Sequence, residues 1–254
     1  MNKKIRIGVF PDGVVGSKVI SFLLENYFND IQWVVCNNQE TIILEILKRS
    51  NFESNNIFLN SQLNEISTIE TIINSKVDYI LLSWWPHIIK EPFLSLPRIG
   101  VLNFHPSLLP FNRGKHYNFW TIVEDTPFGV SIHFANKTID GGDIIFQKKI
   151  EKEWQDTGET IYYKAQNAMV ELFIDSYSKI REKKYTRIQQ DLSIGTLHYA
   201  KELEPASKII LDKEYKAREL INVMRARTFL PHPGSWFEED GVRYEIHINI
   251  TKVK

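Results

Sequence analysis

Residues 101–110 read VLNFHPSLLP, and residues 140–147 read DGGDIIFQ. The apolar run from Ile99 to Phe104 predicts a β-strand, in which Asn103 and His105 point to the same face because side chains alternate along a strand. Pro106 has no N–H to donate to a sheet, so the strand is expected to stop there, with His105 in an extended conformation at its carboxyl end. The sequence thus predicts polar side chains at the end of a buried strand.

A carboxylate is expected to join them from the second quoted stretch. Asp140 follows an alternating run, Val130 to Phe134, and starts an Asp-Gly-Gly-Asp turn. An amide donor, an imidazole that changes protonation near neutral pH and a carboxylate that orients it can together stabilise an oxyanion and move a proton. We therefore expect Asn103, His105 and Asp140 to form a catalytic site. His133 lies on the other face of the second strand from Val130, and we expect it to be partly exposed and not catalytic.

Strand and helix patterns alternate along the first third of the chain. Strand patterns cover Lys4 to Phe10, Ile31 to Cys36, Ile57 to Leu59 and Val77 to Ser83, and helical spacing covers Val14 to Tyr27, Glu40 to Leu47 and Leu63 to Ile73. This alternation predicts an α/β, Rossmann-like fold with a mostly parallel sheet and helices on both faces. Ligands of such folds bind beyond the carboxyl ends of the strands.

The remaining elements are expected to complete this sheet and to add a small extension. We expect helices over residues 115–125 and 159–183 and a returning strand over 144–150. A β-hairpin is predicted from Ser235 to Glu238 and from Arg243 to Ile248, turned at Asp240-Gly241. We expect a catalytic domain over residues 1–200, followed over residues 201–254 by a linker helix and this short C-terminal β-hairpin.

Bulk composition limits the classes of partner. The 254 residues include 31 Lys and Arg against 31 Asp and Glu, and a protein that mainly binds nucleic acid more often has a basic surplus. No apolar run approaches the roughly 18 residues of a membrane span, and the first residues lead straight into a strand. The single cysteine, Cys36, lies in an apolar run, and no Cys/His cluster suggests a metal. We expect a cytoplasmic protein that binds neither nucleic acid, nor membrane, nor metal.

The two quoted motifs also carry a family resemblance. Asn-x-His-Pro-Ser-Leu-Leu-Pro at 103–110, then Arg113-Gly114, then Asp-Gly-Gly-Asp-Ile-Ile-Phe-Gln at 140–147, resembles the signature of the 10-formyltetrahydrofolate-dependent formyltransferases. The resemblance implies that Asn103, His105 and Asp140 are the catalytic residues. It also implies that 10-formyltetrahydrofolate is the cofactor and that tetrahydrofolate is released.

The resemblance further implies a pterin pocket in the loop that follows the strand ending at Ser83. We expect Trp85, Pro86 and Ile88, together with Asp140, to contact the folate. A tryptophan in a loop can wall a flat heteroaromatic ligand. The alternative for the tryptophans is core packing. His87 is expected to be a surface histidine.

Four residues are candidates for contact with the acceptor substrate: Arg113, Gly13, Ser107 and Tyr117. Arg113 could bind a phosphate or carboxylate with two parallel hydrogen bonds, and a structural ion pair is the alternative. Gly13 lies in the first strand-to-helix turn, where a purely conformational role is the alternative. Ser107 belongs to a turn bracketed by prolines, and core packing is the default role for Tyr117.

The end of the chain distinguishes members of this family. Residues 196–201, 221–227 and 231–237 resemble the segment that closes the catalytic domain of methionyl-tRNA formyltransferase, but only a hairpin follows. This shorter architecture resembles the nucleotide-sugar N-formyltransferases, whose C-terminal strands often form a homodimer. The resemblance implies formylation of a nucleotide-linked amino sugar of the dTDP-4-amino-4,6-dideoxyglucose type, for lipopolysaccharide O-antigen synthesis. Alternatives are Met-tRNA or glycinamide ribonucleotide as acceptor, and a folate-binding or nucleotide-sugar-binding protein without catalysis.

Overall fold

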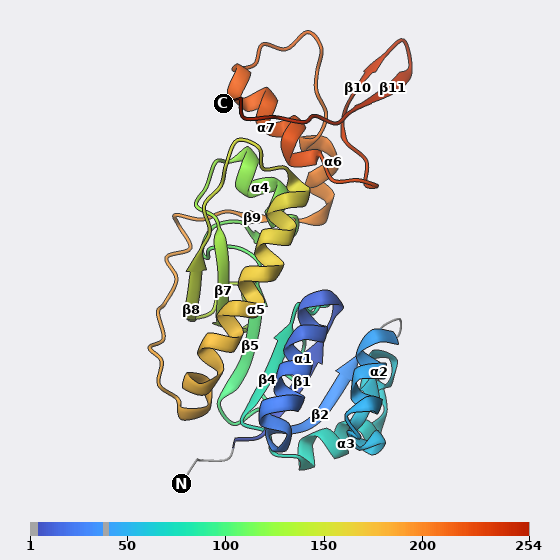
Figure 1. The fold of residues 1–254 in the computed structure, drawn as a ribbon, viewed down its shortest axis with the longest axis vertical. Coiled ribbons are helices and arrows are strands. Elements are labelled where there is room, and N and C mark those ends of the chain that lie inside the picture. Colours follow the sequence, from blue (N-terminus) through green and yellow to red (C-terminus); the bar gives the residue numbers. More distant parts are fainter. Residues whose placement is uncertain (1–4, 38–40, 254) are drawn as a thin grey trace. The chain divides into compact units, whose positions relative to one another are not determined.

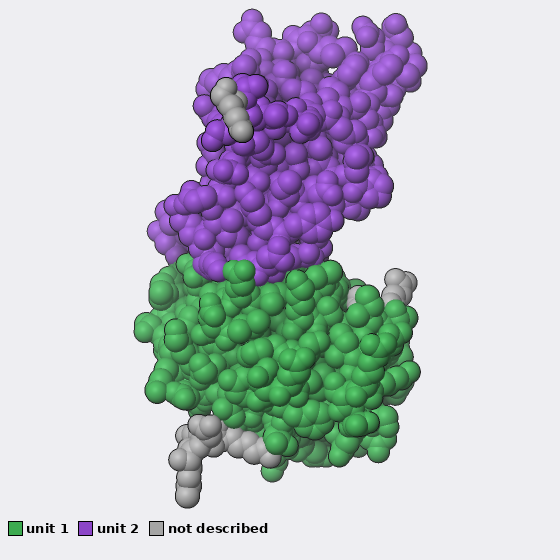
Figure 2. Space-filling model, in the orientation of Figure 1, with its two compact units in different colours: residues 1–105, 131–147, 169–190 green, residues 106–130, 148–168, 191–254 purple. Residues whose placement is uncertain are grey.

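A computed structural model of the chain describes residues 5–37 and 41–253. The chain divides into two compact units that alternate along the sequence (Figure 2). The first unit consists of Met1–His105, Ser131–Gln147 and Met169–Gln190, and the second consists of Pro106–Val130, Lys148–Ala168 and Asp191–Lys254. The expected division into residues 1–200 and 201–254 stays a prediction.

A mostly parallel sheet forms the centre of the first unit. Within the described residues it has seven strands in the order β3-β2-β1-β4-β5-β7-β8. The strands are β1 (Ile7–Pro11), β2 (Ile31–Cys36), β3 (Ile57–Leu59), β4 (Tyr79–Ser83), β5 (Gly100–His105), β7 (Gly129–Phe134) and β8 (Ile144–Lys149). The first five strands in chain order pair in parallel, and β7 pairs antiparallel with β5. The predicted Rossmann-like α/β fold is therefore confirmed.

Helices pack on both faces of this sheet (Figure 1). They are α1 (Gly13–Tyr27), α2 (Thr41–Arg49), α3 (Ile66–Asn74) and α5 (Gly158–Glu182), with short 3-10 turns η1 (Phe28–Asp30), η2 (Ser54–Asn56) and η3 (Asn60–Asn64). Phe22 of α1 and Phe104 of β5 both contact Phe173 of α5, so α1 and α5 share one face. On the opposite face, Ile72 of α3 joins a buried cluster with Phe10 and Val101.

Sequence periodicity located most of these elements to within a few residues. The strands over 31–36 and 57–59 are confirmed residue for residue. Helix α3 begins later than predicted because residues 60–64 form a 3-10 turn, in which the side chain of Gln62 accepts a hydrogen bond from the backbone of Leu59. The predictions for Lys4 and Glu40 lie outside the described residues.

The second unit carries shorter elements. They are β6 (Arg113–Gly114), α4 (Tyr117–Val123), β9 (Leu197–His198), η4 (Ala200–Glu202), α6 (Leu203–Ala206), α7 (Ala217–Arg227), β10 (Ser235–Glu239) and β11 (Val242–Ile246). Helix α4 is shorter than predicted because its N-cap residue, His116, has a left-handed backbone with φ +61. Strands β10 and β11 form the predicted antiparallel hairpin. None of the helices in the described part of the chain is long and apolar enough to cross a membrane.

Candidate active site

Strand β5 brings the first two predicted residues together. Val101 belongs to the buried cluster that includes Ile72 of α3, and alternation along the strand places Asn103 and His105 on the same face as Val101. Phe104 points the other way, toward Phe173 of α5. The strand ends at His105, directly before the proline, as expected.

The loop between β7 and β8 supplies the third residue. The N–H of Phe134 donates to the carbonyl of Asp143 at 2.8 Å, which closes the loop at its base. A side chain on Gly142 would lie 1.9 Å from the carbonyl oxygen of Phe134, so only glycine allows this approach. Asp140 itself has φ +48, a strained backbone conformation for a residue other than glycine. The loop is folded back tightly and aims Asp140 at the end of β5.

The three side chains meet at the carboxylate. Nδ2 of Asn103 donates to Oδ1 of Asp140 at 3.1 Å, and Nδ1 of His105 lies 3.4 Å from Oδ2 of the same group. The side chains of His105 and Asp140 are only 5% and 14% exposed, so their interaction is poorly screened by water. A carboxylate so placed orients the imidazole ring. The predicted cluster is present within the first unit, and its catalytic role stays a prediction.

His133 is a neighbour that we did not expect. The sequence reading of a partly exposed residue is wrong: His133 is 1% exposed, and its Nε2 lies 3.2 Å from Nδ2 of Asn103. The reason is the pairing of β5 with β7, in which Asn103 is directly opposite His133. Paired residues in antiparallel strands share a face. Knowing that β5 and β7 are neighbours would have predicted the contact between His133 and Asn103. Alternation within a single strand could not predict it.

Gln190 is a second neighbour that sequence reasoning missed. Its Nε2 donates to the carbonyl oxygens of Asp140 and Gly142 at 2.8 and 2.6 Å, and the side chain is buried. An isolated antiparallel bridge between Ile144 and Ile188 brings the segment after α5 alongside the Asp140 loop. Gln190 therefore holds the backbone of the Asp140 loop. No local motif marks it, since its partners are carbonyl groups almost fifty positions away.

The loop after β4 contains the predicted folate contacts. Trp85 is buried in the cluster around Phe10, and the centroids of the two rings lie 5.1 Å apart. The ring of Trp85 therefore packs in the core, which was the alternative to a ligand contact. Its Nε1 and the hydroxyl of Ser83 are buried without a hydrogen-bond partner in residues 5–37 and 41–253. Ile88 is 74% exposed, and Pro86 is exposed as well.

These features suit a polar, flat ligand. Strand β4 lies next to β1, where the strand order reverses, which is the usual place for a ligand in an open α/β sheet. Trp84, which we did not single out, has φ +64, and strained backbone of this kind concentrates at ligand sites. Orphaned donors at the end of β4 offer hydrogen bonds to a heteroaromatic ring. The folate contacts themselves remain predicted.

The first turn lies at the end of β1. Gly13 opens α1 with φ +56, and a Cβ at this position would meet no atom within 4 Å, so the glycine serves backbone conformation and leaves open space. Burial raises the pKa of the neighbouring Asp12 carboxyl, opposed by a hydrogen bond from Asn37 and by the charge of His87. Contact of Gly13 with substrate remains a prediction.

The other three substrate candidates lie in the second unit. Ser107 is buried, and its hydroxyl donates to the carbonyl of Phe111 at 2.7 Å, which stabilises the turn. Tyr117 is buried and stacks on Tyr162. Arg113 is 7% exposed, and its Nε has no hydrogen-bond partner in the described part of the chain. Of the three, only Arg113 carries the charge that a ligand anion would need, and all three contacts remain predicted.

Three cationic side chains are grouped in the second unit, and two of them, Lys115 and His116, lie near Arg113 in sequence. Burial, the charge of Arg227 and the charge of Lys115 together lower the pKa of His116. Nε of Arg227 is buried without a hydrogen-bond partner among the described residues. We call Lys115, His116 and Arg227 the cationic cluster. Nη2 of Arg227 also lies 3.4 Å from Oε2 of Glu204.

The described residues hold no group of three or more His, Cys, Asp or Glu side chains arranged for a metal ion.

A formyl transferase is the class of protein that this fold and cluster define. Residues 12–176 match the family model described as formyl transferase, so the chain belongs to the formyl transferase family, and the predicted resemblance is confirmed. Residues 202–252 match the model described as N-formyltransferase dimerization C-terminal domain.

Individual relatives agree with this family. Methionyl-tRNA formyltransferase of Malacoplasma penetrans (strain HF-2) is 28% identical over 240 residues, which is 91% of this chain and 72% of that protein. The crystal structure of a 4-N formyltransferase from Francisella tularensis is 26% identical, with a TM-score of 0.77 and coverage of 98% of this chain and 99% of that one. The fold is also that of the N-formyltransferase from Helicobacter canadensis in complex with folinic acid and dTDP-3-aminofucose, at 17% identity, a TM-score of 0.69 and coverage of 93% and 85%.

Proposed function

We propose that this chain transfers a formyl group from 10-formyltetrahydrofolate to the amine of a nucleotide-linked amino sugar. The observation that carries the proposal is the convergence of Asn103 and His105 on the two oxygens of Asp140. An amide donor and an oriented imidazole are the groups that acyl transfer to an amine requires. Membership of the formyl transferase family supports the same reaction.

Each side chain has a distinct part in the proposed reaction. When bound, 10-formyltetrahydrofolate supplies the formyl group. An N–H of Asn103 stabilises the negative charge that develops on the carbonyl oxygen in the transition state. His105 takes the proton from the attacking amine and returns it to the folate nitrogen as the bond between that nitrogen and the formyl carbon breaks, which releases tetrahydrofolate. Asp140 keeps the imidazole in the required orientation and stabilises its charged form.

The proposed folate contacts are Trp85, Pro86, Ile88 and Asp140. For Trp85 we propose a contact through Nε1 alone and not through the face of the ring. The ring packs in the core, and the buried Nε1 is the atom left for a ligand. The orphaned hydroxyl of Ser83 lies on the same strand end and supports a ligand with hydrogen-bonding atoms in its plane. A folate head group has this chemistry.

We propose a nucleotide-linked amino sugar as the acceptor. More specifically, we propose a sugar of the dTDP-4-amino-4,6-dideoxyglucose type, formylated for lipopolysaccharide O-antigen synthesis. The likeness to the Francisella 4-N formyltransferase supports a 4-amino acceptor, and the Helicobacter complex contains a dTDP-linked amino sugar. Two members of the cationic cluster, Lys115 and Arg227, are basic side chains of the kind that bind a diphosphate. We propose Arg113, Gly13, Ser107 and Tyr117 as acceptor contacts.

Met-tRNA is the second candidate acceptor, and the likeness to the Malacoplasma enzyme favours it. The equal numbers of basic and acidic residues argue for a small acceptor, since tRNA binding draws on many phosphate contacts.

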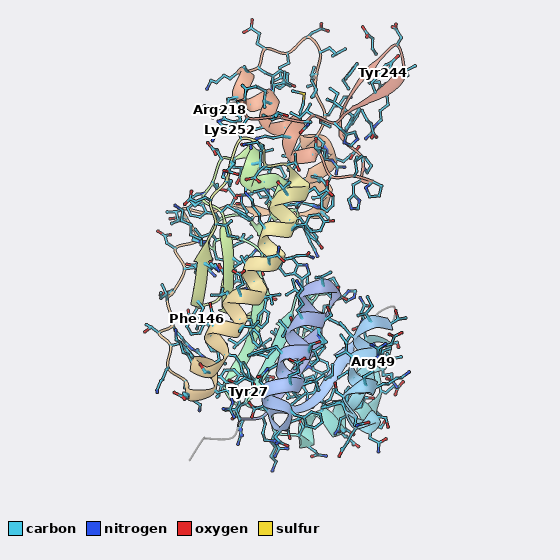
Figure 3. All side chains as sticks on the ribbon, viewed as in Figure 1. Tyr27, Arg49, Phe146, Arg218, Tyr244 and Lys252 are labelled. Carbon is cyan, nitrogen blue, oxygen red and sulfur yellow. The ribbon has the colours of Figure 1, made fainter. Side chains whose placement is uncertain are left out.

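We also propose that the chain forms a homodimer through its C-terminal hairpin. The hairpin lies within the residues that match the dimerization domain. On one of its faces Phe237 stacks on Tyr244 with ring centroids 5.2 Å apart, and Tyr244 and Val242 are 47% and 50% exposed. Tyr244 is labelled on the hairpin in Figure 3. The opposite face is covered, because Lys208 and Arg243 lie over the ring of Trp236. The exposed aromatic face is what a second copy would bury.

A panel of acceptors tests the proposed function. Purified protein with 10-formyltetrahydrofolate is given dTDP-, UDP- and GDP-linked 3-amino and 4-amino sugars, with glycinamide ribonucleotide and Met-tRNA as controls, and released tetrahydrofolate is measured. Turnover with a 4-amino dTDP-sugar is expected. Turnover only with Met-tRNA or glycinamide ribonucleotide would replace the proposed acceptor, and folate binding without any turnover would favour a non-catalytic binding protein.

A further inference from the structure

His133 lies against the catalytic amide on its buried side. It is paired with Asn103 across β5 and β7, and its side chain is 1% exposed. Its Nε2 lies 3.2 Å from Nδ2 of Asn103 and 3.6 Å from Oδ1 of Asp140. The proposed reaction gives this ring no direct part, yet it occupies the space behind the group that stabilises the transition state.

The other ring nitrogen fixes the tautomer of His133. Nδ1 lies 3.0 Å from the carbonyl oxygen of Phe134. A carbonyl oxygen only accepts hydrogen bonds, so Nδ1 carries the hydrogen. In the neutral ring Nε2 then has a free lone pair and accepts from the amide nitrogen of Asn103. This is the tautomer that free histidine favours less, and the protein selects it with one backbone carbonyl.

The amide of Asn103 could in principle adopt either of two orientations that differ by a half turn. In the observed orientation its nitrogen faces two acceptors, Nε2 of His133 and Oδ1 of Asp140. The opposite orientation would place the amide oxygen against a lone pair and a carboxylate oxygen, and both contacts would be repulsive. We infer that His133 is a positioning residue that fixes the Asn103 amide with its nitrogen toward the reacting carbonyl, an inference that rests on the proposed function.

The Asn103 amide needs two hydrogen-bond acceptors because its bond to one of them, Asp140, must break during the reaction. Both hydrogens of the Asn103 amide nitrogen are engaged, one by His133 and one by Asp140. To stabilise the transition state, the amide must exchange its bond with Asp140 for one with the carbonyl oxygen of the formyl group. During that exchange His133 alone holds the orientation. Loss of His133 should therefore lower kcat while substrate binding is kept.

The tautomer is tested without any substrate. The protein is labelled with ¹⁵N in its histidine rings, and the signals of His133 are assigned by comparison with the His133→Gln variant. The expected spectrum shows Nδ1 protonated and Nε2 unprotonated at neutral pH. An Nε2-protonated or doubly protonated ring would overturn the inference, because Nε2 could then not accept from Asn103. Since no turnover is measured, this result is independent of the proposed function.

Kinetics test the positioning role. In His133→Leu, kcat is expected to fall roughly 10- to 100-fold while KM for folate and acceptor changes by about twofold or less. His133→Gln, which offers an amide oxygen as acceptor, should recover part of this loss. The matched control is Ile132→Val, on the opposite face of the same strand, which should leave kcat unchanged.

A double-variant comparison separates positioning from a general structural effect. In an Asn103→Ala background, His133→Leu is expected to have no further effect on kcat, because its target is gone. An equal loss of kcat with and without Asn103 would overturn the inference, as would a His133→Gln variant as impaired as His133→Leu. Absence of turnover in the wild-type protein would refute the proposed function. The inference about His133 would then be tested by the ¹⁵N measurement of its tautomer, which needs no turnover.

Discussion

Nδ2 of Asn103 lies 3.1 Å from Oδ1 of Asp140, although the two residues are 37 positions apart. The other carboxylate oxygen lies 3.4 Å from Nδ1 of His105. One acceptor group thus contacts both the proposed oxyanion donor and the proposed base. Because the carboxylate has two oxygens, it can release one partner during the reaction and still orient the other.

Gln190 should matter to activity because it holds the backbone of the Asp140 loop. Gln190→Leu removes both hydrogen bonds to the carbonyls of Asp140 and Gly142, leaving buried acceptors unpaired. We expect the free energy of unfolding to fall by about 1–3 kcal/mol, with kcat falling because the strained Asp140 loop relaxes. Urea unfolding and steady-state kinetics measure both. Gln189→Leu, at the exposed neighbour, is the matched control, and equal behaviour of the two variants would contradict this role.

Trp85 should contribute mainly to the stability of the fold. Its ring is buried against Phe10, so Trp85→Ala is expected to lower the free energy of unfolding by about 3–5 kcal/mol. Trp154→Ala, at a tryptophan that is 44% exposed and lies beside two arginines, should cost only about 1 kcal/mol. Trp85→Phe keeps a ring in the core and removes Nε1, so a raised KM for folate in this variant would support the proposed folate contact. A Trp85→Ala protein as stable as Trp154→Ala would refute the core role.

His116 should make the protein less stable in mild acid. Its pKa is lowered from 6.5 by burial and by Arg227 and Lys115, so the unfolded chain binds a proton at a higher pH than the folded chain does. Stability is therefore lost as the pH falls below 6.5 and levels off below the folded pKa. His116→Asn, which tolerates the left-handed backbone, should reduce this loss. Urea unfolding at about pH 7.5 and about pH 5.5 makes the comparison, and an unchanged difference between the two pH values would count against it.

Tyr244 should control assembly. Tyr244→Asp places a charge on the exposed aromatic face of the hairpin, and we expect it to convert the proposed dimer into a monomer, as judged by sedimentation velocity. Tyr199→Asp is the matched control, because Tyr199 is exposed to the same extent, 47%, and lies outside the hairpin. A dimer that survives Tyr244→Asp, or that Tyr199→Asp also dissociates, would place the interface elsewhere.

Local periodicity predicted most of the fold because each strand or helix carries its own pattern. The strand over residues 31–36 and the hairpin at 235–246 were predictable from alternation and from the Asp240-Gly241 turn. Helix α4 was predicted over residues 115–125, but its exact start at Tyr117 was not, since that start depends on the left-handed backbone of His116. A run of residues does not reveal such a conformation when no glycine or proline marks it.

The cluster of Asn103, His105 and Asp140 was predictable for a different reason. Asn103 and His105 share a face by alternation within one strand, and Asp140 was picked out by the Asp-Gly-Gly-Asp turn that follows the next strand and by the family motif. His133 and Gln190 were missed because their contacts depend on which strands are neighbours. The pairing of β5 with β7 and the bridge between Ile144 and Ile188 are properties of the tertiary fold, and no local pattern encodes them.

The most direct test of the account is the rate of formyl transfer by Asn103→Ala, His105→Ala and Asp140→Asn, measured with the best acceptor of the panel. Each variant is expected to keep its fold and its affinity for the nucleotide sugar while kcat falls by roughly 100-fold or more, because the transition state loses its donor, its base or the group that orients both. Asn26→Ala, an exposed asparagine on α1, should turn over normally. Turnover within about twofold of the wild-type rate in Asn103→Ala or His105→Ala would contradict the central claim.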